Sequence, residues 1–227
     1  MATLIAEDLL LLLLDDESGK LTNTTFLDAG LGGALLVELA LGEQVEVVKG
    51  SGLWARAKVR PTTAATPSDP VLAAALAFVA EKERTAQDLV GRLGKGRREP
   101  LLARLEAAGI LERQDDRVMG LFPRRRWPTR DGAHEADLRR RLGDAVVRGA
   151  WPEERTAALI AVLSAMDLAH KVIDPDGLPR RQLKARAKEI SDGDWAAKAV
   201  KDAITAAQAA MTAAVVAATA STAATSG

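Results

Sequence analysis

The stretch that decides the fold is LIAEDLLLLLL, residues Leu4–Leu14. It ends at Asp15-Asp16 and is too short for a transmembrane helix, which needs ~20 apolar residues. Glu7 and Asp8 lie inside the run, and no basic residue precedes it, so it lacks the pattern of a signal peptide. We therefore predict a buried helix, closed by the acidic turn Asp15–Gly19, around which the other helices pack.

The composition favours helices over sheets and a reducing compartment. Aromatic residues make up 3% of the chain, tyrosine is absent, and the core must therefore be built from Leu, Ala and Val. The chain has no cysteine, which excludes disulfides and thiolate metal sites. It has only two histidines, His134 and His170, which are far apart in sequence. We expect a cytoplasmic protein with no metal site and no cofactor.

The predicted fold is mainly α: a single globular domain over residues 1–218 around the buried apolar helix, followed by a disordered tail at 219–227. Leucine spacing, caps and prolines predict its helices. After Leu4–Leu14, these run from a cap at Asn23 or Thr24 to 41, over 70–82, as two short helices between Thr85 and Gly109, and over 132–149, 152–173, 179–190 and 194–218. Two short β-hairpins are also expected, Val45–Val48 with Leu53–Ala55 and Ile110-Leu111 with Val118-Met119.

Three glycines, Gly30, Gly32 and Gly33, lie inside the second predicted helix. They resemble a dinucleotide-binding loop, but no strand precedes them and Leu35 occupies the position of the third glycine in that motif. We interpret them as sites where another element packs closely against the helix. A tight approach by a ligand is the alternative.

No pattern of catalytic residues is present. The serines are few, and neither histidine stands in a nucleophile motif. Glu7-Asp8 and Asp15-Asp16 are adjacent pairs whose side chains diverge on a helix, so we expect solvated helix ends or internal caps rather than acid–base pairs. The chain is therefore predicted not to be an enzyme.

Basic residues are concentrated in one part of a chain whose net charge is zero. Residues 91–148 carry fifteen Lys/Arg against nine Asp/Glu, whereas residues 1–60 carry five against nine. This asymmetry indicates an anionic partner. The basic side chains precede one predicted helix (Arg92, Lys95, Arg97, Arg98) and follow the second hairpin (Arg124, Arg125, Arg126, Arg130).

Two kinds of anionic partner fit this stretch. Helix, turn, helix and hairpin is the order of a winged-helix DNA-binding domain, although Glu99 and Glu106 on the second helix would repel phosphates. Alternatively, the basic residues contact lipid headgroups while apolar hairpin residues enter the membrane interface. The residues expected at that interface are Val118, Met119, Leu121, Phe122 and Trp127. A soluble scaffold for protein interactions is a further alternative.

Three segments resemble the Golgi phosphoprotein 3 family. They are Glu7-Asp8-Leu9 with its leucine run and acidic turn, GLGGALLVELAL at residues 30–41, and LEAAGIL at residues 105–111. The second segment is the most specific, and the resemblance extends over about residues 4–218. The alanine-rich, tyrosine-free composition suits a bacterial member.

The resemblance implies a helical peripheral membrane protein that binds phosphatidylinositol 4-phosphate reversibly at the inner face of the membrane. The headgroup pocket of the family uses a tryptophan, an arginine in the glycine turn and a pair of basic residues. Here the pair corresponds to Lys95 and Arg98, and the turn arginine corresponds to Gly32. The tryptophan lacks a counterpart in the matching region, residues 23–27.

The resemblance also implies a membrane-contact hairpin at about residues 113–122, with Arg124, Arg125, Arg126 and Trp127 following it. In the family this hairpin helps the protein to oligomerise, so a homo-oligomer and a protein partner of unknown identity are expectations. Nucleic acid is the less favoured partner. With two headgroup bases instead of three, we expect general attraction to acidic lipids to outweigh headgroup specificity.

Overall fold

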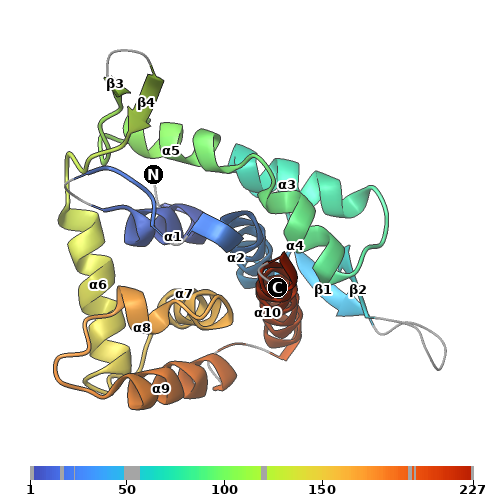
Figure 1. Cartoon of the computed structure of the whole chain (residues 1–227). Helices are drawn as coiled ribbons and strands as arrows, with labels where there is room; N and C mark the ends of the chain where they lie inside the picture. The colour runs from blue at the N-terminus through green and yellow to red at the C-terminus, as the bar shows by residue number, and fades with distance from the viewer. Residues whose placement is uncertain are drawn as a thin grey trace.

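The computed structural model describes residues 3–15, 18–22, 24–48, 57–118, 122–193, 196 and 198–225. Ten α-helices, one 3₁₀ helix and two antiparallel hairpins lie within these residues, which confirms the mainly α prediction (Figure 1). In chain order they are α1 Ile5–Leu13, η1 Thr24–Phe26, α2 Leu27–Leu41, β1 Val45–Val48, β2 Lys58–Pro61, α3 Pro70–Ala80, α4 Ala86–Gly94, α5 Arg98–Ala107, β3 Gln114–Val118, β4 Phe122–Arg126, α6 Ala133–Val146, α7 Glu154–Ala165, α8 Ala169–Val172, α9 Arg180–Asp192 and α10 Lys198–Thr225.

Helix α1 is buried on every side, as its sequence predicts. All of its residues, from Ile5 to Leu13, are buried, including Glu7 and Asp8. The helices that contact it are α2, α5, α6 and α7, which come from distant parts of the chain (Figure 1). A helix that is apolar all round is stable in water only when other elements cover all of it.

Helix α2 lies against α1, α4 and α10, and its glycines make this packing close. A Cβ atom at Gly32 would lie 1.9 Å from the carbonyl oxygen of Val90 in α4, and one at Gly33 would lie 2.2 Å from Sδ of Met211 in α10. At Gly32 the obstacle is backbone, so no larger residue fits, whereas at Gly33 a larger residue would require the Met211 side chain to shift. The interpretation of these glycines as close-packing sites is therefore confirmed.

The helix ends show the predicted caps. The side chain of Asp69 accepts hydrogen bonds from the backbone N–H groups of Val71 and Leu72 at the start of α3. Gly109 follows α5 with a φ of +77°, a left-handed conformation that favours glycine. Asp69 therefore marks the start of α3 and Gly109 the end of α5, at the positions that the sequence indicates.

Both hairpins differ from the prediction in which residues pair. β1 pairs with β2 at Lys58–Pro61; the predicted partner, Leu53–Ala55, lies outside the described residues. In the second hairpin, Gln114–Val118 forms strand β3 and pairs with Phe122–Arg126, so the residues predicted as the turn are a strand. Ile110-Leu111 is not a strand, and Leu111 makes only an isolated bridge to Thr129.

The C-terminal helices also depart from the predicted bounds. The predicted helix over 152–173 is two helices, α7 and α8, separated at Asp167, whose φ of 56° is left-handed and interrupts the helix. Helix α10 continues to Thr225, so it ends later than predicted and includes most of the expected tail. No described helix is long and apolar enough to cross a membrane.

Candidate functional site

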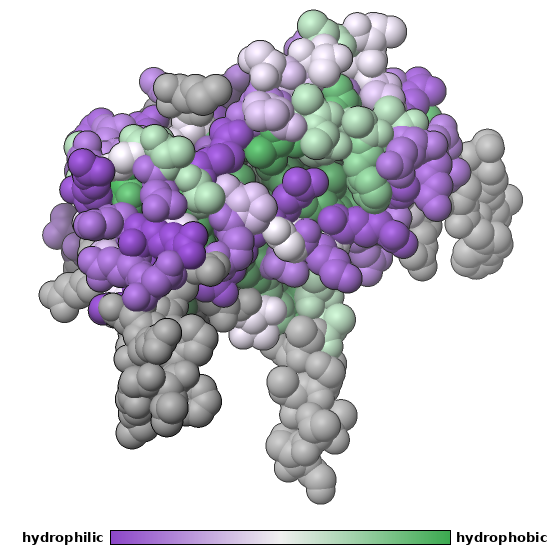
Figure 2. Space-filling view, turned by 90° about the horizontal axis from the view of Figure 1, so that it is seen from above, coloured by the Kyte–Doolittle hydropathy of each residue, from purple (hydrophilic) through white to green (hydrophobic). Residues whose placement is uncertain are grey.

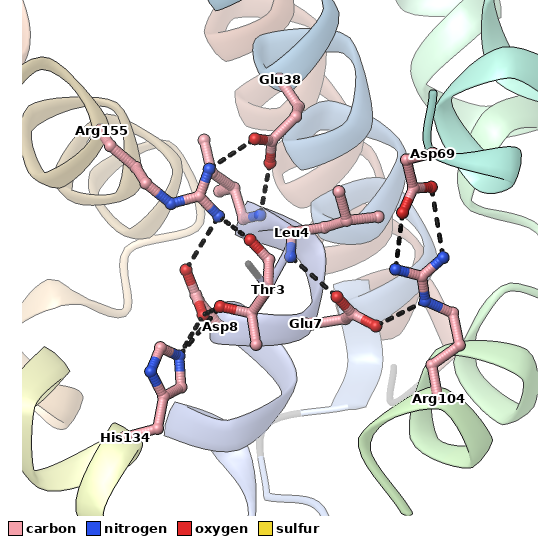
Figure 3. Close-up of polar contacts among 10 residues, drawn as sticks. Thr3, Leu4, Glu7, Asp8, Glu38, Asp69, Arg104, His134 and Arg155 are labelled. Atoms are coloured by element: carbon pink, nitrogen blue, oxygen red, sulfur yellow. Dashed lines mark hydrogen bonds and ion pairs between the residues drawn. The ribbon is translucent and has the colours of Figure 1, made fainter. Parts of the chain in front are cut away.

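The two acidic residues of α1 are the centre of a buried charge network (Figure 3). Glu7 accepts a hydrogen bond from the backbone N–H of Leu4, 2.7 Å away, and so caps its own helix. Its other oxygen lies 2.7 Å from Nε of Arg104 on α5. Arg104 also forms a bidentate pair with Asp69, at 3.2 and 2.7 Å. Burial opposes ionisation of Asp69, but the hydrogen bonds from Arg104 and the backbone lower its pKa.

Asp8 belongs to the second half of this network. It accepts hydrogen bonds from Thr3 Oγ1 at 2.7 Å and from Arg155 Nη2 at 3.2 Å, and its Oδ1 lies 2.8 Å from His134 Nε2. Arg155 also donates to Glu38 Oε1 at 2.5 Å and to the backbone carbonyl of Thr3. Burial raises the pKa of Glu38, against the lowering effect of Arg155.

The Thr3, His134 and Asp8 side chains resemble a catalytic triad in composition but not in geometry. In a triad the nucleophile and the carboxylate contact opposite nitrogens of the imidazole. Here Thr3 Oγ1 and Asp8 Oδ1 both lie within 3.0 Å of the same nitrogen, Nε2. The network therefore joins α1 to five other elements and has no proton-relay arrangement.

Glu7 is an internal cap, as predicted, although it is buried rather than solvated.

Gly32, predicted to line the headgroup pocket, does not reach a surface. It is buried against α4, and a Cβ at Gly94 in α4 would in turn lie 1.7 Å from the carbonyl oxygen of Asp28. The two helices are in backbone contact at this point, which leaves no space for a ligand. The assignment of Gly32 to headgroup binding is therefore wrong.

The predicted basic pair lies on the connection between α4 and α5. Lys95 is the residue that ends α4, Arg98 is the first residue of α5, and both are exposed. The Nε atom of Arg98 lies 3.8 Å from Oε1 of Glu99. Because Gly94 packs on the backbone of Asp28, this connection is fixed beside the start of α2.

An open pocket of about 430 Å³ lies next to Arg98. Its other lining residues come from the end of η1, the first turn of α2 and helix α10: Thr25, Phe26, Leu27, Asp28, Ala29 and Ala214. This brings Arg98 together with the segment that matches the tryptophan region of the family. Lys95 is not among the lining residues. Asp28 is exposed and acidic, which opposes the binding of an anion.

Trp127, predicted to contact a membrane, is buried instead. Trp127 is 3% exposed, and its backbone N–H donates to the carbonyl oxygen of Gly19 at 2.9 Å. A Cβ at Gly19 would lie 2.5 Å from the backbone of Pro128, so the chain after β4 is tightly packed on the turn after α1. The prediction for Trp127 is wrong because this packing turns the indole into the core.

The β3–β4 hairpin projects from the helical body on the side opposite to β1–β2 (Figure 1). Its register places Asp115 opposite Arg125 and Asp116 opposite Arg124. The hairpin thus combines four arginines with two aspartates, and Arg126 is half-buried at its base. Of the predicted contact residues, Met119 and Leu121 lie outside the described residues, as do the side chains of Val118, Phe122, Arg124 and Arg125.

The part of the chain that the structure describes offers no candidate metal site. It contains no group of three or more His, Asp or Glu residues arranged to hold a metal ion. Hydrophilic residues cover most of the face in Figure 2, with smaller hydrophobic areas between them. Charged side chains on this kind of surface are normal for a folded domain.

The fold and the exposed basic connection define a class of helical domain built around a buried, acid-containing N-terminal helix. The family model described as Golgi phosphoprotein 3 (GPP34) matches residues 5–207. The chain therefore belongs to the Golgi phosphoprotein 3 family. A comparison with curated proteins found no match.

Proposed function

We propose that this chain is a lipid-binding protein rather than an enzyme, and that it attaches reversibly to the inner face of a membrane through anionic headgroups. Phosphatidylinositol 4-phosphate is the specific headgroup that family membership favours. The observation that carries the proposal is the pocket beside Arg98, which unites one base of the predicted pair with the start of α2.

Geometry favours phosphate as the contacting group. Arg98 lies at the N-terminus of α5, where the helix dipole also attracts anions. Lys95, three residues earlier and exposed, adds a second positive charge on the same connection. A guanidinium and an ammonium on a rigid connection suit a monophosphate at the edge of a bilayer.

The same site argues for modest headgroup selectivity. Arg98 is the one basic residue in the pocket lining, and each charge-assisted hydrogen bond that such a site lacks costs about 1–3 kcal/mol. That loss equals roughly a tenfold to hundredfold weaker affinity. The arginines of β4 supply general attraction to acidic lipids, about 1 kcal/mol each near the surface. Acidic lipid therefore provides most of the binding free energy, and the pocket adds the preference for phosphate.

The DNA-binding alternative gains no support from α5. Its apolar residues Leu101, Leu102 and Leu105 are buried. Arg104, the basic residue in the last turn of this helix, points to Glu7 and Asp69 and not outward (Figure 3). A recognition helix needs side chains free to reach base edges.

Liposome co-sedimentation tests the proposal. The vesicles are neutral phosphatidylcholine alone, or with phosphatidylserine, or with phosphatidylinositol 4-phosphate at equal surface charge. We expect pelleting with both acidic vesicles, more with phosphatidylinositol 4-phosphate, and an approximately tenfold or greater loss of that excess in Lys95→Ala/Arg98→Ala.

The matched control is Arg140→Ala/Arg148→Ala, which removes the same charge from exposed positions on α6 and just after it. It should bind as the unaltered chain does. Failure to pellet with any acidic vesicle would refute membrane binding. Equal losses in the two double variants would refute a role for the Arg98 pocket and leave only general electrostatic attraction.

A further inference from the structure

The Arg98 pocket contains one positive and one negative side chain on segments that the backbone holds together. Arg98 begins α5, and Asp28 lies in the first turn of α2. Gly94 packs directly on the backbone of Asp28, and it precedes Arg98 closely in the chain. The two segments that carry these charges are therefore fixed relative to each other.

Both charges are open to a ligand. Asp28 and Arg98 are exposed, and among the described residues the Asp28 side chain forms no hydrogen bond or ion pair. Nε of Arg98 lies 3.8 Å from Glu99, but the two side chains are 44% and 50% exposed, and such a pair is weak. Within the described part of the chain, the pocket thus offers a cation and an anion that are not paired with each other.

The rest of the pocket lining is uncharged. Its apolar members are Phe26, Leu27, Ala29 and Ala214, which offer surface to a short carbon chain. Thr25 is exposed, and its hydroxyl donates and accepts hydrogen bonds. Because the lining holds one arginine and one aspartate, it matches a ligand whose own negative and positive groups are joined by a short chain.

We propose that the Arg98 pocket binds a phosphate ester of ethanolamine. The phosphate contacts the guanidinium of Arg98, and the primary ammonium, two carbons away, donates hydrogen bonds to the carboxylate of Asp28. In a membrane this ligand is the headgroup of phosphatidylethanolamine, and in solution it is glycerophosphoethanolamine. The proposal rests on the proposed function for the place of the pocket at a membrane, and it adds a second class of headgroup to the inositol phosphate.

Two related headgroups fit this pocket less well. Choline carries a trimethylammonium group, which has no N–H to donate to Asp28 and which proteins bind in cages of aromatic rings. Phe26 is the one aromatic residue in the lining. Serine carries a carboxylate on the same carbon as its ammonium, and Asp28 repels it. We therefore expect the pocket to prefer ethanolamine to both.

The test compares vesicles that differ only in the N-methylation of a neutral headgroup. All contain the same fraction of phosphatidylserine, which supplies general electrostatic attraction. The remainder is phosphatidylcholine alone or an equal mixture of phosphatidylcholine and phosphatidylethanolamine, so the surface charge is the same because both neutral lipids are zwitterions. In co-sedimentation we expect about threefold to fivefold tighter binding to the vesicles with phosphatidylethanolamine, the worth of one exposed ion pair.

Three variants show whether the preference comes from the pocket. Asp28→Asn should abolish it without weakening attachment to phosphatidylserine, and Arg98→Ala should abolish it as well. Glu99→Gln is the matched control, because it removes the same charge beside Arg98 from a side chain outside the pocket lining. It should keep the preference. A chain that pellets but shows no preference, or a preference that Asp28→Asn retains in full, would overturn the proposal.

A measurement in solution separates this proposal from the proposed function. Glycerophosphoethanolamine, glycerophosphocholine and inorganic phosphate are titrated separately and followed by ligand-observed NMR. The first should bind with a dissociation constant on the order of 1 mM, several-fold more tightly than the other two. If the chain pelleted with no vesicle, membrane attachment would be refuted. Selective binding of the ethanolamine ester that Asp28→Asn removes would then still support the pocket, and equal or absent binding of the three compounds would overturn it.

Discussion

Removing Arg155 tests the claim that the charge network on α1 stabilises the fold. In Arg155→Leu, Asp8 and Glu38 lose a partner but stay in place, with side chains 2% and 12% exposed. Breaking a buried ion pair costs about 3–5 kcal/mol. Arg155 is 34% exposed, so solvent screening reduces the expected loss to about 2–4 kcal/mol of unfolding free energy. For a chain of this length, the melting temperature falls by roughly 4–16 °C.

The assay is urea unfolding at about pH 7.5 and again at about pH 5. Burial already raises the pKa of Glu38, and loss of Arg155 raises it further. At the lower pH the folded variant therefore binds a proton on Glu38 more readily than the unfolded chain does, and the deficit becomes smaller. The added substitution Glu38→Gln should likewise recover part of the loss at pH 7.5, because it removes the uncompensated charge.

Arg140→Leu is the matched control. Arg140 also contacts two carboxylates, Asp137 at 2.5 Å and Asp144 at 3.0 Å, but it is 60% exposed. Its replacement should change stability far less than that of Arg155, because exposed ion pairs are worth little. A deficit below about 1 kcal/mol in Arg155→Leu, or one as small as that of the control, would refute the reasoning.

Three further outcomes follow from the packing and charges described above. Gly94→Ala should destabilise the fold by at least about 2 kcal/mol, since its Cβ would meet the Asp28 carbonyl oxygen; Gly91→Ala in the same helix, which meets nothing within 4 Å, should be neutral or stabilising in thermal unfolding. The lowered pKa of His170 means that the stability contribution of its neutral form is present above pH 6.5 and is lost as pH falls through the folded-state value. His170→Gln should therefore lose less stability in urea between about pH 7 and about pH 5 than the unaltered chain, and an equal loss would contradict this. Asp28→Asn should bind acidic liposomes more tightly by removing a carboxylate next to Arg98, and weaker binding would argue against an anion in that pocket.

Local signals predicted the helices well because they lie within each segment. A few neighbouring residues are enough to predict the leucine run of α1 as a buried helix, Asp69 as an N-cap and Gly109 as a helix end. The glycines of α2 predicted close packing, but the sequence did not identify α4 as the partner. The sequence could therefore predict where the helices lie along the chain, but it could not predict which helices pack against one another.

The second hairpin was misplaced because its strands lack an apolar pattern. Gln114–Val118 has the composition of a turn, and its pairing with β4 places aspartates opposite arginines. That pairing depends on the register of two segments and cannot be recognised from either one alone. Likewise, a tryptophan next to three arginines is typical of a membrane interface, and only the burial of Trp127 in the folded chain shows that it belongs to the core.

The partners of Glu7 and Asp8 could not be identified from the sequence either. Two acidic residues inside an apolar helix indicate that basic side chains from elsewhere in the chain pair with them, because unpaired buried charges are costly. With 31 lysines and arginines in the chain, that signal does not select Arg104 and Arg155. For the candidate lipid site, the sequence singled out Arg98, which lines an open pocket in the structure, but it did not indicate Asp28, which lines the same pocket.

The burial of α1 has a consequence for how the chain folds during synthesis. Thr3 and Arg155, which hydrogen-bond in the folded protein, are 152 residues apart, and α7, on which Arg155 lies, covers one side of α1. A nascent chain therefore carries six consecutive exposed leucines until most of the domain has been made. Such a segment is a target for chaperones and a starting point for aggregation. The charges of Glu7 and Asp8 keep it more soluble during that wait, before Arg104 and Arg155 are available to neutralise them.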